Sequence, residues 1–184
     1  HEFHGIMHNM VQFVPLEDSV KISIMKIKNT SEKMRKINLV YYIRPVLGVS
    51  DQFTAPHIST DLHRSGAVLI KNNYNEEFSG TIGFIDSSIE KRSVTGDRRE
   101  FFGTGNIKNP QGIMQKEFSG RVGAGSDPCA ALSVNCELAP GEEKEIVFLL
   151  GAGMSEEEVE ILITRYRKIK EVKKALKEVK DFWE

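Results

Sequence analysis

The stretch TGDRREFFGTGN, residues 95–106, contains the side chains whose types and spacing best suit a chemical task. Asp97 and Glu100 enclose two arginines, the first of which is Arg98, and Phe101 begins a pair of phenylalanines. A sugar site uses this combination, because hydroxyl groups need planar polar partners and the faces of the ring need an apolar platform. A salt-bridged turn between strands has the same composition. The residues alone leave both interpretations open.

The two carboxylates could also form the acid/base pair with which glycoside hydrolases cleave a glycosidic bond. The neighbouring Arg98 and Arg99 argue against this role, because a nearby guanidinium keeps a carboxylate ionised and unable to donate a proton. Charged clusters of this kind are far more often structural than catalytic. We therefore expect no catalytic residue here.

The histidines do not have the spacing of a metal site. His4 and His8 would lie together only on a helix, and Gly5 and the strand pattern nearby argue against one. His57 and His63 are six residues apart, so an uninterrupted strand would turn both toward one face, either a solvent face or the lining of a groove. We expect the solvent face and no metal.

Length, charge and cysteine content exclude several classes of protein. The 184 residues correspond to one domain, and a net charge of -1 lacks the concentrated basic face of a nucleic-acid binder. Cys129 and Cys136 are too few for a disulfide framework or a zinc site and fit reduced, packed strand residues. The sequence has no apolar run of membrane-spanning length and no signal peptide at its start. We expect a cytoplasmic domain that binds no nucleic acid, and a chain that is a piece of something longer because it does not begin with Met.

The elements that must hold these residues are strands. From residue 10 to about 150, short runs of apolar and polar residues are separated by turn signals, without a helical period. Runs 20–24 and 37–43 alternate strictly, and the connection 28–36 predicts a hairpin that makes them an antiparallel pair. Further candidates lie at 67–71, 80–86, 131–138 and 144–151. The glycine pairs that begin at 103, 123 and 151 are predicted to lie in turns. Strands at this spacing predict an antiparallel β-sandwich.

The pattern changes to a helix after Met154. Ser155 with Glu158 is a capping box, and an acidic first turn suits the positive end of a helix dipole. Apolar residues then recur at spacings of three and four, at Val159, Leu162, Tyr166, Ile169, Val172, Leu176, Val179 and Trp183. This predicts one helix of nearly thirty residues whose later half lies on the sandwich, on a second copy or on another domain. The final Phe182 and Trp183 favour another domain.

Several longer strings together resemble one family. They are VQFVPLEDSVKISIMKIKNTSEKMRKINLVYYIRPVLG, HISTD, KNNYNEEFSGTIGFID, TGDRREFFG and GAGSDPCAALSVNCELAPGEEKEIVFLLG. In order and spacing they are similar to the sandwich segment of glycoside phosphorylases of the cellobiose phosphorylase family. GAGSDPCAAL is most similar to the branch that contains cyclic β-1,2-glucan synthases and β-1,2-oligoglucan phosphorylases. Arg44 and Pro45 of IRPVLG depart from the Glu and Trp that are usual there.

The resemblance implies a mainly β architecture and a division of labour. Residues 1–153 would form a galactose-mutarotase-like supersandwich without its earliest strands. Residues 154–184 would be a linker helix leading to an (α/α)₆ barrel outside this chain, which holds the catalytic Asp and inorganic phosphate for inverting phosphorolysis. The parent would be a glycosyltransferase or glycoside phosphorylase. This chain alone would be inactive, with no catalytic residue and no cofactor of its own.

The resemblance also implies a sugar contact. The family string T-x-D-R-x-x-F-x-G lies where the sandwich meets the barrel, and here its positions are Thr95, Asp97, Arg98, Phe101 and Gly103. Arg98 would donate to sugar hydroxyls, Asp97 would orient Arg98, and Phe101 would supply a platform or join the core. With Glu100, these residues form the predicted substrate-binding set. The expected partners are a β-glucan oligosaccharide and the barrel of the same polypeptide.

Two further functions are compatible with the residues. A purely structural sandwich would use its helix and sheet edges to form a homodimer and would have no affinity for sugar. An independent mutarotase-like enzyme would need His57, His63 and Asp61 to converge in a groove, which we rank below the other two. The parent could be a cytoplasmic phosphorylase or a membrane-embedded glucan synthase.

Overall fold

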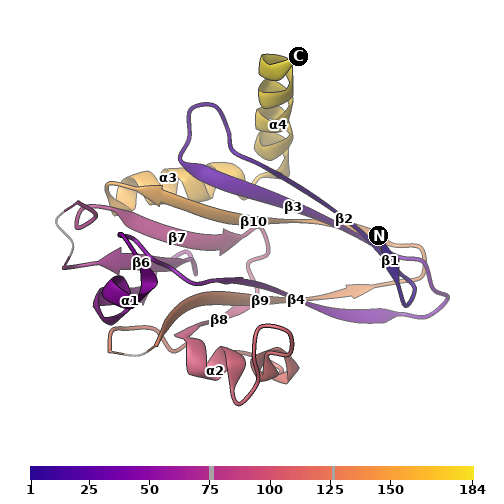
Figure 1. Cartoon of the computed structure of the whole chain (residues 1–184). Helices are drawn as coiled ribbons and strands as arrows, with labels where there is room; N and C mark the ends of the chain where they lie inside the picture. The colour runs from indigo at the N-terminus through magenta and orange to yellow at the C-terminus, as the bar shows by residue number, and fades with distance from the viewer. Residues whose placement is uncertain (75–76, 126) are drawn as a thin grey trace.

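The computed structural model describes residues 1–74, 77–125 and 127–184. Asn75, Glu76 and Ser126, which belong to two of the strings that carry the family resemblance, lie outside the described residues. The described chain forms two antiparallel sheets that pack face to face (Figure 1). Within the described residues, no helix is both long and apolar enough to cross a membrane.

In the described ranges, the larger sheet has seven strands and the smaller has three. In spatial order the larger sheet contains β1 (Glu2–Phe3), β2 (Ile6–Phe13), β3 (Val20–Asn29), β10 (Glu143–Gly153), β7 (Ile82–Ser87), β6 (Val68–Asn72) and β5 (Ile58–Leu62). The smaller sheet contains β4 (Arg35–Ile43), β9 (Pro128–Leu138) and β8 (Arg92–Asp97). The α-helices are α1 (Asp51–Thr54), α2 (Arg98–Phe102), α3 (Glu156–Tyr166) and α4 (Ile169–Trp183), and the short 3₁₀ helices are η1 (Ala55–His57) and η2 (Gln111–Met114). The predicted sandwich is confirmed.

Alternating apolar residues build the core between the sheets. Ile27, Ile70 and Ile85 of the larger sheet face Leu132 and Val134 of the smaller one, and all five side chains are buried. Burial of side chains of this size stabilises a fold by roughly 1.5–3 kcal/mol each. The apolar side chains at every second position of these strands therefore hold the two sheets together.

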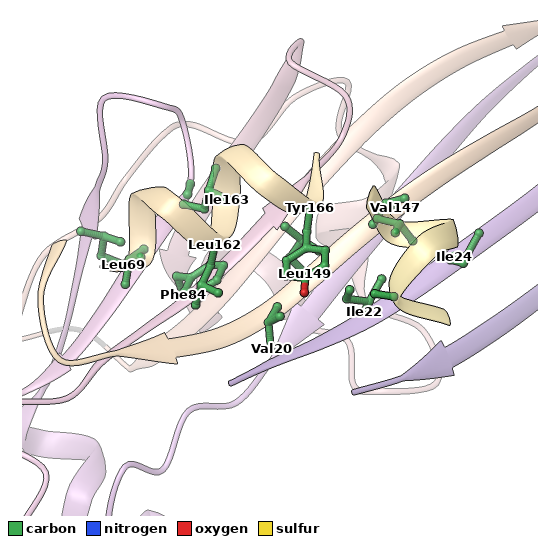
Figure 2. Close-up of a cluster of buried hydrophobic side chains, with 14 residues drawn as sticks. Val20, Ile22, Ile24, Leu69, Phe84, Val147, Leu149, Leu162, Ile163 and Tyr166 are labelled. Atoms are coloured by element: carbon green, nitrogen blue, oxygen red, sulfur yellow. The ribbon is translucent and has the colours of Figure 1, made fainter. Parts of the chain in front are cut away.

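A second core lies on the opposite face of the larger sheet, under α3 and the start of α4 (Figure 2). Leu162, Ile163 and Tyr166 of α3 pack against Phe84 and Leu149 of the sheet. Ser155 caps α3 as predicted, since its hydroxyl accepts from the Glu158 main-chain N at 3.2 Å, and the Glu158 carboxylate accepts from the Met154 main-chain N at 2.7 Å. The larger sheet is thus apolar on both faces.

The glycine pair at 151 lies inside β10 and not in the turn predicted for it. Gly151 pairs with Phe84 of β7 and Val20 of β3. A Cβ atom added to Gly151 would lie 2.6 Å from the Phe84 ring, so the close packing of that ring requires glycine.

The predicted hairpin between residues 20–24 and 37–43 is wrong. β3 pairs with β2 and β10 in the larger sheet, whereas β4 pairs with β9 in the smaller one. The buried Asn29 side chain organises the crossover by donating to the carbonyls of Lys33 at 2.7 Å and Leu138 at 3.0 Å. Alternation showed that each strand has an apolar face, but it does not determine which strand is its neighbour.

The prediction of a single long helix is also wrong. The chain leaves the helical conformation at Lys168, where ψ is 110°, and α4 begins at the next residue. Val172 and Ala175 of α4 are buried on the sandwich, so part of the apolar stripe packs within this chain. The rest of α4 projects away from the sheets (Figure 1) and exposes 64% of Phe182 and 78% of Trp183.

Candidate functional site

The stretch that suggested a sugar site forms the end of β8 and the short helix α2. Asp97 is the N-cap of α2, because its Oδ1 accepts from the Arg99 main-chain N at 2.9 Å. The helix then lies on the outer face of the smaller sheet, where Phe101 and Phe102 are buried against Tyr42 of β4. The charged residues at the start of α2 thus lie next to a cluster of buried aromatic side chains.

Phe101 is a core residue. Its side chain is buried, and its ring stacks on Tyr42 at 4.3 Å between centroids and meets Phe102 edge-on at 5.0 Å. Of the two roles considered for Phe101, the arrangement matches packing in the core and not a platform for sugar.

The two carboxylates are held by neighbouring groups. Asp97 Oδ2 accepts from Arg121 Nη1 at 3.0 Å, and Asp97 is 5% exposed. Glu100 accepts from the Thr95 hydroxyl at 2.6 Å and from the Ser119 main-chain N and hydroxyl at 2.7 Å each. These bonds match the salt-bridged turn that the composition left open. They also tie residues 119–121 to the edge of β8.

Arg98, like Glu100, is partly exposed to solvent, whereas Asp97 and Phe101 of the predicted set are buried. Its Nη1 donates to Asp127 Oδ2 at 3.0 Å, and its guanidinium carbon lies 5.0 Å from the centroid of the Phe102 ring. The side chain is 43% exposed. Among the described contacts, Asp97 bonds Arg99 and Arg121, so Asp127 takes the orienting role that the resemblance assigned to Asp97.

Asp127, Arg44 and Asp51 are linked to Arg98 by bonds that the sequence did not reveal. The second oxygen of Asp127 accepts from Arg44 Nη1. Arg44 in turn donates to both oxygens of Asp51, with Nε to Oδ1 at 2.8 Å and Nη2 to Oδ2 at 3.2 Å. We call Asp51, Arg44, Asp127 and Arg98 the outer charge cluster. Its two arginines lie 83 and 29 residues from Asp127, and no local spacing signals such contacts.

Hydrogen bonds within the outer charge cluster favour the charged forms of Asp127, Arg44 and Arg98. Burial raises the pKa of Asp127, but hydrogen bonds from Arg44 and Arg98 outweigh burial and lower the pKa below its usual value. Burial likewise opposes the charge of Arg44, and its bonds to Asp51 and Asp127 more than compensate. The hydrogen bond with Asp127 raises the pKa of Arg98. Two cations and two anions therefore give the cluster a net charge of zero.

The histidines do not converge on one face. His57 lies in η1 before the strand begins and stacks on Tyr74 at 4.2 Å, whereas His63 follows the end of β5 and its Nδ1 lies 2.8 Å from the Ser65 hydroxyl. The two histidines do not share a strand, because η1 precedes β5 and β5 ends at Leu62. The expected solvent face is wrong for His63, which is buried. In the part of the chain that the structure describes, no three His, Cys, Asp or Glu side chains are placed to hold a metal.

Neither cysteine has the environment of a nucleophile. Both are free, Cys129 is fully buried, and burial raises its pKa to about 12. Burial also raises the pKa of Cys136. The two residues are packed strand cysteines, as the composition predicts.

Comparison with known proteins agrees with the resemblance found in the strings. The glycosyl hydrolase 94 supersandwich domain matches residues 1–169. The chain is 29% identical over 180 residues to the cyclic beta-(1,2)-glucan synthase NdvB of Rhizobium meliloti (strain 1021), covering 96% of this chain and 6% of that protein. It is 25% identical over 198 residues to the N,N'-diacetylchitobiose phosphorylase of Vibrio proteolyticus, covering 100% of this chain and 23% of that protein.

A cellobionic acid phosphorylase of Neurospora crassa is 23% identical over 175 residues, which cover 90% of this chain and 22% of that protein. The chain thus spans less than a quarter of the length of each of these relatives. The family match extends over both sheets and α3. This chain therefore belongs to the glycosyl hydrolase 94 supersandwich domain family.

Proposed function

We propose that this chain is a non-catalytic module that helps to orient a β-glucan oligosaccharide in a larger glycoside phosphorylase or cyclic glucan synthase. The observation that carries the proposal is the Arg98 guanidinium, which is half exposed yet fixed on Asp127 and over the Phe102 ring. A planar guanidinium presents several N–H donors in fixed directions, which suits neighbouring sugar hydroxyls. Holding it in place before binding reduces the entropy that binding costs.

The surroundings of Arg98 support a binding role over a catalytic one. Asp97 is buried and ion-paired, and Glu100 is fully engaged with Thr95 and Ser119. A general acid needs a carboxyl group that can hold a proton near neutral pH, and an ion-paired carboxylate does not meet this need. Catalysis and inorganic phosphate are therefore assigned to a catalytic barrel of the same polypeptide.

The proposed glycan and the proposed partner come from different observations. A relative named as a cyclic beta-(1,2)-glucan synthase suggests a β-1,2-linked glucan as the ligand. The exposed Phe182 and Trp183 at the projecting end of α4 suggest the surface on which the barrel packs. A location in the cytoplasm is part of the same proposal.

The experiment compares two neighbouring arginines in the natural polypeptide that carries this domain. Arg98→Ala should raise KM for a short β-1,2-linked glucan roughly tenfold, because it removes a charged hydrogen-bond donor from the substrate. Arg99→Ala is the matched control, since Arg99 is exposed and no side-chain bond is described for it.

An unchanged KM in Arg98→Ala would contradict the proposal. The structural alternative would then be favoured, provided that the chain forms a dimer by sedimentation and that charge substitution at Phe182 disrupts this dimer. Thermal unfolding of both variants controls for loss of the fold.

A further inference from the structure

We infer that Arg44, acting through Asp127, positions the Arg98 guanidinium and cancels its charge, so that the site selects neutral sugar hydroxyls over anionic groups. This inference rests on the proposed function and specifies the charge class of its ligand. It assigns Arg44 and Asp127 roles as positioning residues.

Asp127 is joined to Arg98 through both main chain and side chain. The Arg98 main-chain N donates to the Asp127 carbonyl at 2.9 Å, and Arg98 Nη1 donates to Asp127 Oδ2 at 3.0 Å. The first bond fixes the start of α2 against the residue that precedes β9. The second fixes the far end of the long arginine side chain, which otherwise has many rotamers. The exposed donors of Arg98 therefore point in a set direction.

Arg44 fixes Asp127 from the other side. Arg44 Nη1 donates to Asp127 Oδ1 and, at 2.9 Å, to the carbonyl of Pro128. The same guanidinium holds both oxygens of Asp51, at the first residue of α1. One side chain thus connects the segment after β4, the start of α1 and the start of β9. A lysine could not replace it, because an ammonium group lacks the planar set of donors that these partners use.

The balance of charge determines which ligand fits. Asp51 and Asp127 neutralise Arg44 and Arg98, so no net positive charge remains to attract a phosphate, sulfate or carboxylate. A sugar hydroxyl can accept from Arg98 and donate to a carboxylate oxygen, and it needs no net charge. Asp127 is 30% exposed at its side chain and lies beside Arg98, so both kinds of partner are within reach of one sugar ring.

The first test is a double-mutant cycle in the natural polypeptide. Arg44→Gln should raise KM for the β-1,2-linked glucan roughly fivefold with kcat unchanged, because the Arg98 donors lose their fixed direction. The Arg44→Gln/Arg98→Ala double variant should have the same KM as Arg98→Ala alone. Arg44→Lys should not restore KM. If the KM increases of the two single variants multiply in the double variant, the positioning role of Arg44 is overturned. This outcome would hold even if Arg98→Ala shows that the proposed function is right.

The second test asks whether the outer charge cluster binds an anion once one of its carboxylates is removed. It does not require that the Arg44 variants fold. Sulfate is titrated into the chain while the arginine Nε–Hε NMR signals are observed. Asp127→Asn should allow sulfate to shift the Arg98 signal, whereas the native chain and the exposed control Asp61→Asn should show no shift. Equal sulfate binding in all three proteins would overturn the charge selection. If Arg98→Ala leaves KM unchanged, the proposed function and this inference fail together.

Discussion

Two clusters of arginine and aspartate lie in the same sandwich, and they differ mainly in burial. The outer charge cluster is partly exposed, with accessible side-chain fractions from 25% for Arg44 to 46% for Asp51. The inner charge cluster, Asp86, Arg92 and Arg167, has a buried centre: 0% of the Asp86 side chain and 2% of the Arg92 side chain are accessible, and Arg167 lies at its edge with 22% accessible.

Arg92 of the inner charge cluster bonds several parts of the protein. Its Nε and Nη groups donate to four carbonyls, those of Ser65, Gly66, Ser87 and Ile89, and its Nη2 forms an ion pair with Asp86 Oδ1 at 2.9 Å. Arg167, just past the end of α3, donates to both oxygens of Asp86 at 2.7 and 2.9 Å. The described side-chain hydrogen bond of Arg98, in contrast, is the one to Asp127. Arg92 and Arg167 thus use their donors to join structural elements, whereas Arg98 has fewer protein partners, and this difference supports the binding role proposed for it.

The largest expected effect is on the inner charge cluster. Asp86→Ala should lower the free energy of unfolding by about 3–5 kcal/mol, because it leaves the buried Arg92 guanidinium and the partly buried Arg167 guanidinium without their counterion. Urea unfolding measures this change. The matched substitution in the outer cluster, Asp127→Ala, should cost only about 1 kcal/mol, since water can solvate the exposed arginines. Equal losses would show that burial does not distinguish the clusters.

Arg167→Met should have the next largest effect, about 1–3 kcal/mol in the free energy of unfolding. The variant removes the bonds that hold the joint between α3 and α4 on Asp86. Because the sequence near Lys168 has no Gly or Pro, the two helices should then tend to form one continuous helix. Spin labels on α4 and β2 would report a changed distance. An unchanged distance with full stability would mean that Val172 and Ala175 alone determine the break.

A smaller effect should appear in the dependence of stability on pH. The folded-state pKa of Asp127 lies below its unfolded value, so its contribution to stability is present above about pH 4 and is lost as pH falls through the folded pKa. The difference in thermal stability between the native chain and Asp127→Asn should therefore be greatest near pH 7 and shrink toward pH 3. A difference independent of pH would show that the ion pairs of Asp127 do not stabilise the fold.

The smallest effect on stability is expected for Arg98→Ala. Exposed ion pairs contribute about 0–1 kcal/mol, and loss of the contact with the Phe102 ring adds little at such a site. Thermal unfolding should therefore show a shift of only a few degrees at most, whereas glycan binding should fall markedly. A stability loss as large as that of Asp86→Ala would make Arg98 a structural residue.

The features that could be predicted from the sequence are those that depend on residues close together in the chain. The alternation of β3 and β4, the cap at Ser155 and the packed cysteines all follow from local pattern, and the structure has them. Local reasoning left two interpretations open for the stretch around Arg98, which the structure shows to be the end of β8 and the short helix α2.

The remaining features depend on contacts between distant segments. The break at Lys168 is associated with Asp86, which lies 81 residues before Arg167, and helix propensity at the break predicts a continuous helix. The Asp127 contact with Arg44 likewise joins residues 83 apart, one just after β4 and the other just before β9. No periodicity or motif encodes these pairs, so the sequence could indicate Arg98 but not the residues that hold it.

The most direct measurement is a titration of the chain with a short β-1,2-linked glucan, followed by the NMR signals of the arginine side chains. The account predicts that the Nε–Hε signals of Arg98 and Arg44 shift, while those of Arg92 and Arg167 stay in place. No shift at Arg98, or shifts confined to the inner charge cluster, would contradict the claim that the outer charge cluster binds the glycan.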